Sequence, residues 1–311
     1  MMKSLAVVFE EPQRLALLPL SLDDRKSDEV LVESRWSAVS AGTERLLYSG
    51  RMPAFPGMGY PLVPGYETVG VVVEAGPQTN LKIGETVFAP GAHCFGAVRG
   101  VHGGTAERLV APASRLLPIP QEFGERGVLL ALAATALHAL AVARPKGKTL
   151  IVGHGALGRL IARIAAADDF APVVWETDPA RAGGALGYET TTPDDDPTRD
   201  YQTIIDVSGD NRALDGLIQR LARGGAVTLA GFYDSVGFAF PPAFMREAEI
   251  RIAAQWASGD LARARDLVVA GKLTLDGLIN RRFAARDASK AYPLAFGDSA
   301  CVKMVLDWSA T

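Results

Sequence analysis

A glycine-rich segment that joins an apolar run to an amphipathic helix constrains this chain more than any other stretch. Residues 149–152 (TLIV) have the composition of a buried strand, and Gly153, Gly155 and Gly158 follow them in the spacing GxGxxG. In a strand–turn–helix unit the first glycine permits the tight turn, the second lets the backbone approach a pyrophosphate, and the third lets the helix pack closely on the sheet. The segment therefore predicts a dinucleotide-binding unit.

The predicted turn and the later strand ends indicate which residues would contact the dinucleotide. Free N–H groups at the helix start favour a pyrophosphate, and we expect His154 to contact the phosphate or the ribose. Two later strands should point at the same crevice, because ligands bind beyond the carboxyl ends of parallel strands. The expected cofactor-binding residues are Gly153, His154, Gly155, Ala156, Leu157, Gly158 and Glu176, with Ser208, Gly209, Gly231 and Phe232 on the nicotinamide side.

The choice between NAD and NADP depends on Glu176, which ends the next apolar strand eighteen residues after Gly158. A carboxylate at this position can accept both hydroxyls of an adenosine ribose and would repel a phosphate there. Arg181, close behind it, argues for the phosphate instead. The placement of the carboxylate favours NAD as the cofactor.

Composition limits the classes of protein to which the chain can belong. Its 311 residues are enough for about two domains, and a net charge of −3 gives no electrostatic footprint for nucleic acid. The two cysteines are far apart in sequence, which excludes a disulfide framework and a four-cysteine zinc lobe. The N-terminus has the pattern of a first strand, and the longest apolar run, Val128–Ala143, is shorter than a bilayer span. We expect a cytoplasmic protein without a transmembrane segment, and peripheral membrane contact stays open.

The order of patterns predicts an α/β chain with two architectures. Short apolar runs punctuated by Gly and Pro fill the first 120 residues and favour a largely antiparallel, barrel-like domain. Strands and helices then alternate, as in a doubly wound parallel sheet, and the chain ends in a strand-like segment of the first domain's character. The expected domains are 1–125 for the substrate, 126–272 for the dinucleotide, and 273–311 as a return to the first. The acidic loop Pro193–Asp200 is expected to be a solvated turn.

Four short motifs carry a resemblance to the medium-chain dehydrogenase/reductase superfamily. They are Ala41–Glu44, Gly65–Gly70, Ile83–Val87 and Gly103–Glu107. The resemblance covers nearly the whole chain and implies a groES-like β-barrel domain, a Rossmann domain and an NAD-dependent alcohol dehydrogenase. Dimerisation through a sheet edge is usual in the superfamily, so the resemblance also leaves a homodimer open.

The departures from that superfamily concern its metal. Zinc-dependent members carry a cysteine where this chain has Ala41 and a histidine where it has Tyr66, and the third-ligand region falls among Ala131–Ala133. The lobe that holds a second zinc is replaced by Pro90–Gly96. Neither an alanine methyl nor a neutral phenol is a credible zinc ligand. The expected metal content is none.

Without zinc, a protein group must accept the alcohol's proton and donors must hold the developing oxyanion. Thr43 matches the family position whose hydroxyl contacts the reacting oxygen and relays the proton. Tyr66 either points its phenol at that oxygen or fills the vacated metal hole. Glu67 and Glu44 are candidate bases, with bracing of the loop as the alternative for Glu67 and a surface or structural role for both.

The remaining histidines outside the glycine turn have other expected roles. His138 lies on an apolar helix and is expected to be a satisfied core residue. His93 and His102 lie on the loop that replaces the zinc lobe, where they are either exposed or able to ligate a chlorin magnesium.

The run from Gly42 to Glu67 carries a narrower resemblance, to a branch of the superfamily that acts on bacteriochlorophyllides in phototrophic bacteria. That resemblance alone implies a chlorin substrate, whose 1-hydroxyethyl group is oxidised to acetyl with NAD late in bacteriochlorophyll a synthesis. Two alternatives stay open: a zinc-independent quinone or enoyl reductase using NAD(P)H, and a non-catalytic NAD-binding sensor.

Overall fold

The computed structural model describes residues 2–168, 170–233 and 235–309. The chain divides into two compact units. Unit 1 comprises Met1–Ala131 and Leu278–Thr311, and unit 2 comprises Leu132–Gly277. The two divisions lie six residues (131 against 125) and five residues (277 against 272) beyond the domain boundaries expected from sequence. Each unit is described below by itself.

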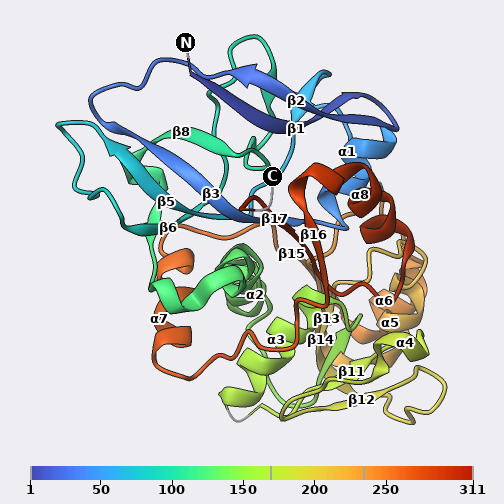
Figure 1. Cartoon of the computed structure of the whole chain (residues 1–311). Coiled ribbons are helices and arrows are strands. Elements are labelled where there is room, and N and C mark those ends of the chain that lie inside the picture. Colours follow the sequence, from blue (N-terminus) through green and yellow to red (C-terminus); the bar gives the residue numbers. More distant parts are fainter. Residues whose placement is uncertain (1, 169, 234, 310–311) are drawn as a thin grey trace. The chain divides into compact units, whose positions relative to one another are not determined.

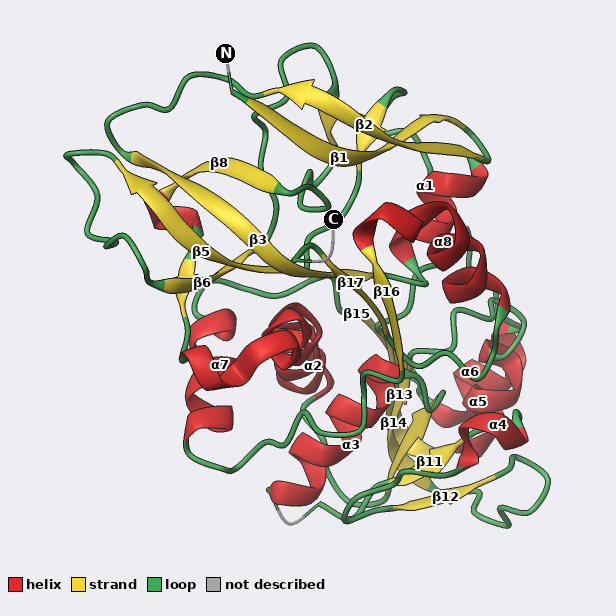
Figure 2. Cartoon of the chain, viewed as in Figure 1, coloured by secondary structure: helices red, strands yellow, loops and turns green. Residues whose placement is uncertain are grey.

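Unit 1 is built mainly from antiparallel strands, coloured yellow in Figure 2. One sheet has the order β2-β1-β4-β7, and a second has the order β16-β17-β3-β5-β6-β9 with β8 also paired to β3. The strands are β1 (Lys3–Glu11), β2 (Arg14–Ser21), β3 (Glu29–Val39), β4 (Leu62–Val63), β5 (Thr68–Ala75), β6 (Thr86–Ala89), β7 (Arg99–Gly100), β8 (Arg108–Pro112), β9 (Leu117–Pro118), β16 (Arg281–Ala284) and β17 (Met304–Asp307). The helical segments are α1 (Thr43–Ser49), α8 (Ala288–Gly297) and the 3₁₀ turns η1 (Ala113–Arg115), η2 (Gln121–Leu129) and η3 (Ala285–Asp287).

Both ends of the chain contribute to the core of unit 1. β17 pairs antiparallel with β3, so that Met304 lies opposite Val39. α8 buries Ala291 and Tyr292 in the same cluster as Phe9 of β1. Burial of apolar side chains from residues almost 300 positions apart stabilises this arrangement, because these side chains pack into one cluster away from water.

Unit 2 is a six-stranded, all-parallel sheet of order β12-β11-β10-β13-β14-β15. Its strands are β10 (Thr149–Val152), β11 (Val173–Trp175), β12 (Glu189–Thr191), β13 (Tyr201–Asp206), β14 (Leu221–Leu229) and β15 (Glu249–Ile252). Its helices are α3 (Ala156–Ala167), α4 (Pro179–Ala182), α5 (Leu214–Arg220), α6 (Phe240–Arg246) and α7 (Asp260–Val269), while α2 (Leu130–Ala143) crosses the division at Ala131. Figure 1 shows α3 on one side of this sheet and α5 and α6 on the other. β10 is buried along its whole length, as a strand covered by helices on both faces must be.

The helical stretch Gln121–Ala143 has 23 residues, and by length and apolar composition it is enough to cross a membrane. The apolar run Val128–Ala143, which by itself is shorter than a bilayer span, forms only part of this stretch. Within the described residues, 61% of its most apolar 18-residue segment is buried inside the protein. A core helix has the same length and composition, so these two properties do not by themselves establish a membrane span.

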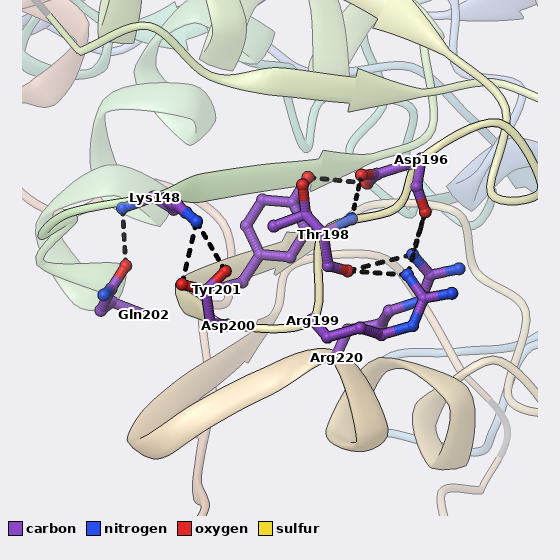
Figure 3. Close-up of polar contacts among 8 residues, drawn as sticks. All are labelled: Lys148, Asp196, Thr198, Arg199, Asp200, Tyr201, Gln202 and Arg220. Atoms are coloured by element: carbon purple, nitrogen blue, oxygen red, sulfur yellow. Dashed lines mark hydrogen bonds and ion pairs between the residues drawn. The ribbon is translucent and has the colours of Figure 1, made fainter.

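The acidic loop before β13 is exposed at most of its positions, as its charge suggested, but one of its carboxylates is buried. Asp196 is only 5% exposed, and its Oδ2 accepts hydrogen bonds from the Trp175 indole at 2.8 Å and the Tyr201 hydroxyl at 2.7 Å. The guanidinium of Arg220 donates to the carbonyls of Asp196 and Thr198 (Figure 3). Asp196 is therefore a structural residue that ties the loop to β11, β13 and the end of α5.

Candidate functional site

The carboxyl edge of the parallel sheet in unit 2 collects the residues predicted to bind a dinucleotide. The strand order places β10 between β11 and β13. After β10 the chain first adds strands on one side of it (β11, β12) and then on the other side (β13, β14, β15), so the strand order reverses at β10. Such a switch point is where doubly wound sheets bind their ligands. The glycine turn follows β10, and the other predicted positions follow the neighbouring strands: Glu176 after β11, Ser208 and Gly209 after β13, Gly231 and Phe232 after β14.

The glycine turn has the shape that a pyrophosphate requires. A Cβ on Gly158 would lie 1.9 Å from the carbonyl oxygen of Gly153, so only glycine lets α3 start this close to the strand. Among the described residues, no heavy atom lies within 4 Å of the point that a Cβ on Gly155 would occupy. Gly155 is also the N-cap of α3 and offers no side chain to the first N–H groups. These residues fit a dinucleotide phosphate.

Glu176 is held by backbone donors on both sides. Its Oε2 accepts the His154 N–H at 3.1 Å and its Oε1 accepts the Asp178 N–H at 2.9 Å. The side chain is half-buried, and each carboxylate oxygen has a second lone pair. The carboxylate is therefore oriented and still able to accept ribose hydroxyls.

His154 does not offer its ring to a cofactor, which corrects the expectation that it contacts phosphate or ribose. The residue is fully buried. Its Nδ1 lies 2.6 Å from the Arg181 carbonyl oxygen and its Nε2 lies 2.8 Å from the Tyr188 hydroxyl. Burial lowers the pKa of His154, so the imidazole is neutral at neutral pH. The ring turns inward because two partners in the following loop satisfy both nitrogens.

The strand ends on the nicotinamide side contain one candidate residue, Asp206, that was not expected from the sequence. Ser208 and Gly209 are exposed, and Phe232 is 46% exposed. Asp206, the last residue of β13, is buried; its Oδ1 accepts the Ser208 N–H at 2.9 Å, and its Oδ2 has no partner among the described residues. Burial raises the pKa of this carboxyl. The sequence did contain a signal for Asp206, because an acidic residue that ends a predicted strand beside the switch point is a candidate for the site.

In unit 1, three hydroxyls converge where the superfamily would carry a metal. The Tyr66 hydroxyl lies 2.7 Å from Ser40 Oγ and 3.5 Å from Thr43 Oγ1. Tyr66 and Thr43 are half-buried, and Ser40 is buried at the end of β3. Burial, with repulsion from Glu67 as the second cause, raises the pKa of Tyr66 above its ordinary value. The phenol is therefore protonated at neutral pH and can donate a hydrogen bond.

His102 lies against this hydroxyl cluster, although exposure was the expected state of its loop. Its ring meets the Tyr66 ring edge to face, with centroids 5.1 Å apart. Burial, together with repulsion from His93 and Arg115, lowers the pKa of His102, so the imidazole is neutral and able to accept a proton. His93 on the same loop is exposed. Sequence spacing could not place His102 beside Tyr66, because thirty-five intervening residues fold between them.

The structure gives Glu67 and Glu44 bracing roles, so neither is supported as a base that touches substrate. Both are fully buried. Glu67 pairs with Lys303 at 2.6 Å. Glu44 accepts the Ser40 N–H at 2.9 Å and the Tyr292 hydroxyl at 2.8 Å. The packing of both chain ends around these carboxyl groups removes them from the surface.

The residues at the metal position of the superfamily do not fit zinc. Ala41 is exposed and carries no donor, and Tyr66 presents a protonated phenol. Across the described ranges, no group of three or more His, Cys, Asp or Glu side chains is arranged to hold a metal ion.

The fold and these two sets of residues define a class. A GroES-like unit joined in one chain to a Rossmann unit with an open glycine turn is a medium-chain dehydrogenase, an enzyme that acts on CH–OH groups. Residues 26–121 match the model of the alcohol dehydrogenase GroES-like domain. The predicted fold class is confirmed.

Comparison with known proteins narrows the class. The chain is 49% identical over 310 residues to the 2-desacetyl-2-hydroxyethyl bacteriochlorophyllide A dehydrogenase of Rhodobacter capsulatus, with 99% of each chain covered. It belongs to the family of bacteriochlorophyllide dehydrogenases.

Solved structures agree on the fold. An Escherichia coli alcohol dehydrogenase, rspB, complexed with NADH, superimposes with a TM-score of 0.84 at 19% identity, covering 99% of this chain and 100% of that one. The acetophenone reductase of Geotrichum candidum, in complex with NAD, gives a TM-score of 0.82 at 21% identity, covering 98% and 97%. Binding of a nicotinamide dinucleotide is typical of these structural neighbours.

Proposed function

We propose that this chain oxidises the 3-(1-hydroxyethyl) group of a bacteriochlorophyllide to a 3-acetyl group, with NAD as hydride acceptor and without catalytic zinc, in bacteriochlorophyll a biosynthesis. The assignment of this substrate rests on 49% identity, over 99% of the chain, to a dehydrogenase whose name contains that substrate. The reaction converts a secondary alcohol and NAD⁺ into a ketone, NADH and a proton.

The choice of NAD is supported by Glu176. Its carboxylate is fixed by the N–H groups of His154 and Asp178 at the end of β11. At that position a carboxylate accepts ribose hydroxyls and repels a 2′-phosphate. NAD, when bound, supplies the acceptor for the hydride that leaves the carbinol carbon.

The hydroxyl cluster supplies the groups that the alcohol needs. The protonated Tyr66 phenol can donate to the reacting oxygen, and Ser40 orients that phenol through the 2.7 Å contact. Thr43 adds a second hydroxyl. Because His102 is neutral and packs against Tyr66, we assign it as the acceptor of the alcohol's proton.

The test is turnover by the purified protein. Incubation with 3-hydroxyethyl bacteriochlorophyllide and NAD should give one NADH per acetyl product, followed by the red shift of the chlorin absorption, and a chelator should leave the rate unchanged. Zinc at one per chain with chelator-sensitive activity would contradict the zinc-free proposal. A preference for NADPH with turnover of quinones or enoyl compounds, or NAD binding without any turnover, would contradict the assigned reaction.

Variants of the cluster test the assigned roles. Tyr66→Phe should lower kcat by roughly 100-fold, the usual effect of removing one oxyanion donor. Tyr48→Phe is the matched control, because its hydroxyl donates to the backbone carbonyl of Gln13 rather than to the hydroxyl cluster. His102→Gln should abolish the acidic limb of the pH–rate profile. An unchanged acidic limb would contradict the role of His102 as proton acceptor.

A further inference from the structure

The loop that follows Glu176 is tied to the glycine turn by a buried polar network. The Arg159 guanidinium donates from Nε to the His154 carbonyl at 3.0 Å and from Nη2 to the Arg181 carbonyl at 3.0 Å. Arg159 is 5% exposed and His154 fully buried. One guanidinium therefore joins the turn to the loop, and the His154 ring joins them a second time.

The partners determine which nitrogen of His154 carries the proton. The Arg181 carbonyl can only accept, so Nδ1, at 2.6 Å, must be the N–H donor. Because burial and Arg159 lower the pKa of His154, the ring is neutral and Nε2 is an acceptor. Tyr188 then donates its hydroxyl to Nε2 at 2.8 Å. Each buried polar atom of the ring is satisfied by the loop 177–188.

Glu176 lies between the glycine turn and the loop 177–188, the two segments that this network joins. One of its carboxylate oxygens is held by an N–H of the turn and the other by an N–H of the loop, at 3.1 Å and 2.9 Å. If the loop moved away from the turn, the carboxylate could keep only one of these donors. The orientation of the Glu176 carboxylate therefore depends indirectly on the contacts that the His154 and Arg159 side chains make with the loop.

We infer that His154, Tyr188 and Arg159 are positioning residues that set the discrimination between NAD and NADP by holding the loop 177–188 against the glycine turn. The inference rests on the proposed use of NAD. With the loop held, Glu176 faces a ribose with both oxygens oriented. With the loop released, the oriented carboxylate is lost, and Arg181, carried on the same loop, becomes able to approach a 2′-phosphate.

Two variants and a matched control test this. Tyr188→Phe removes the hydroxyl that donates to His154 Nε2 and keeps the aromatic ring, and His154→Ala removes both contacts of the imidazole. His138→Asn is the control, since His138 faces Asp260 at 3.6 Å, outside the network. NADH and NADPH dissociation constants are measured by fluorescence titration, and amide exchange of residues 177–188 is measured in the apo protein.

We expect NADH binding to weaken about fivefold in Tyr188→Phe, the equivalent of one net hydrogen bond, and about 20-fold in His154→Ala. NADPH binding should change less, so the ratio of the NADPH to the NADH dissociation constant should fall. Exchange of the loop amides should accelerate in both variants. The control should match the wild type. If His154→Ala fails to fold, the cofactor titrations and amide exchange of Tyr188→Phe alone test the inference.

An unchanged NADH to NADPH ratio in Tyr188→Phe, with loop exchange as in the wild type, would overturn the inference. Equal weakening of both cofactors would also overturn it, because the network would then serve general stability. A wild-type preference for NADPH would instead overturn the proposed use of NAD, so the two failures are distinguishable.

Discussion

Single residues show how burial sets chemistry in this protein, and Glu44 is the clearest example. Its carboxyl group is fully buried between the Ser40 N–H and the Tyr292 hydroxyl. Burial raises its pKa from 4.5 to about 7, and the two hydrogen bonds only partly oppose that rise. From sequence it was a candidate base, because nothing local in the chain indicates that Tyr292, 248 positions away, covers it.

The stability of the fold should therefore depend on pH through Glu44. The folded pKa is raised, so between pH 4.5 and about 7 the folded state keeps a proton that the unfolded state releases. The free energy of unfolding should fall as pH rises through this window, by roughly 3 kcal/mol in total. Glu44→Gln should remove this dependence, as measured by urea unfolding at about pH 5 and about pH 8.

Glu11→Gln provides the control for that measurement, because Glu11 is an exposed carboxylate paired with Arg14. It should leave the pH dependence of the wild type intact. A Glu44→Gln protein whose unfolding free energy still falls by the wild-type amount would show that another group titrates in this window.

At the scale of elements, the glycine turn and α3 are specified by local sequence. The spacing of three glycines after an apolar strand predicted both the turn and the helix. In the structure, a Cβ on Gly158 would lie 1.9 Å from the Gly153 carbonyl oxygen, whereas a Cβ on Gly155 would meet open space. The loop Pro193–Asp200 shows the opposite case. Its charges suggested solvation, yet Asp196 is buried by Trp175 and Tyr201, which contact it only in the folded sheet.

The two glycines should separate folding from cofactor binding. Gly158→Ala forces a Cβ against the Gly153 carbonyl and should lower the free energy of unfolding by about 1–3 kcal/mol. Gly155→Ala should leave unfolding within about 0.5 kcal/mol of wild type, since its Cβ meets open space. It should nevertheless weaken NADH binding, because that space is where the pyrophosphate approaches. Chemical unfolding and NADH titration measure the two effects, and equal stability loss in both variants would contradict the assignment.

At the scale of the whole molecule, one buried ion pair joins distant parts of unit 1. Lys303 precedes β17 near the C-terminus and Glu67 precedes β5, and their charged atoms lie 2.6 Å apart with exposures of 4% and 0%. Lys303 Nζ also lies 3.4 Å from the Val39 carbonyl of β3. The pair therefore fixes the returning C-terminal segment to the strands of the N-terminal segment.

Breaking this pair on one side should be costly. Lys303→Met leaves the Glu67 carboxylate buried without its cation and should lower the free energy of unfolding by about 3–5 kcal/mol. Adding Glu67→Gln should restore much of that loss, because the orphaned charge is then removed. Lys290→Met, which removes an exposed partner of Asp287, is the control and should change little. Equal stability of the Lys303 and Lys290 variants would contradict a structural role for the buried pair.

The sequence by itself determined the local features: the glycine turn, the acid after the next strand, the alternation of strands and helices, and the absence of zinc-type donors at positions 41 and 66. These depend on spacing along a few dozen residues, where backbone geometry dictates what each residue type can do. Only the tertiary structure decided which polar groups meet. It brought Ser40 and His102 to Tyr66, and it buried Glu44 and Glu67 under residues from the far end of the chain. It also turned the His154 ring into the loop 177–188. These pairings follow from close packing of segments distant in sequence, which no local pattern encodes.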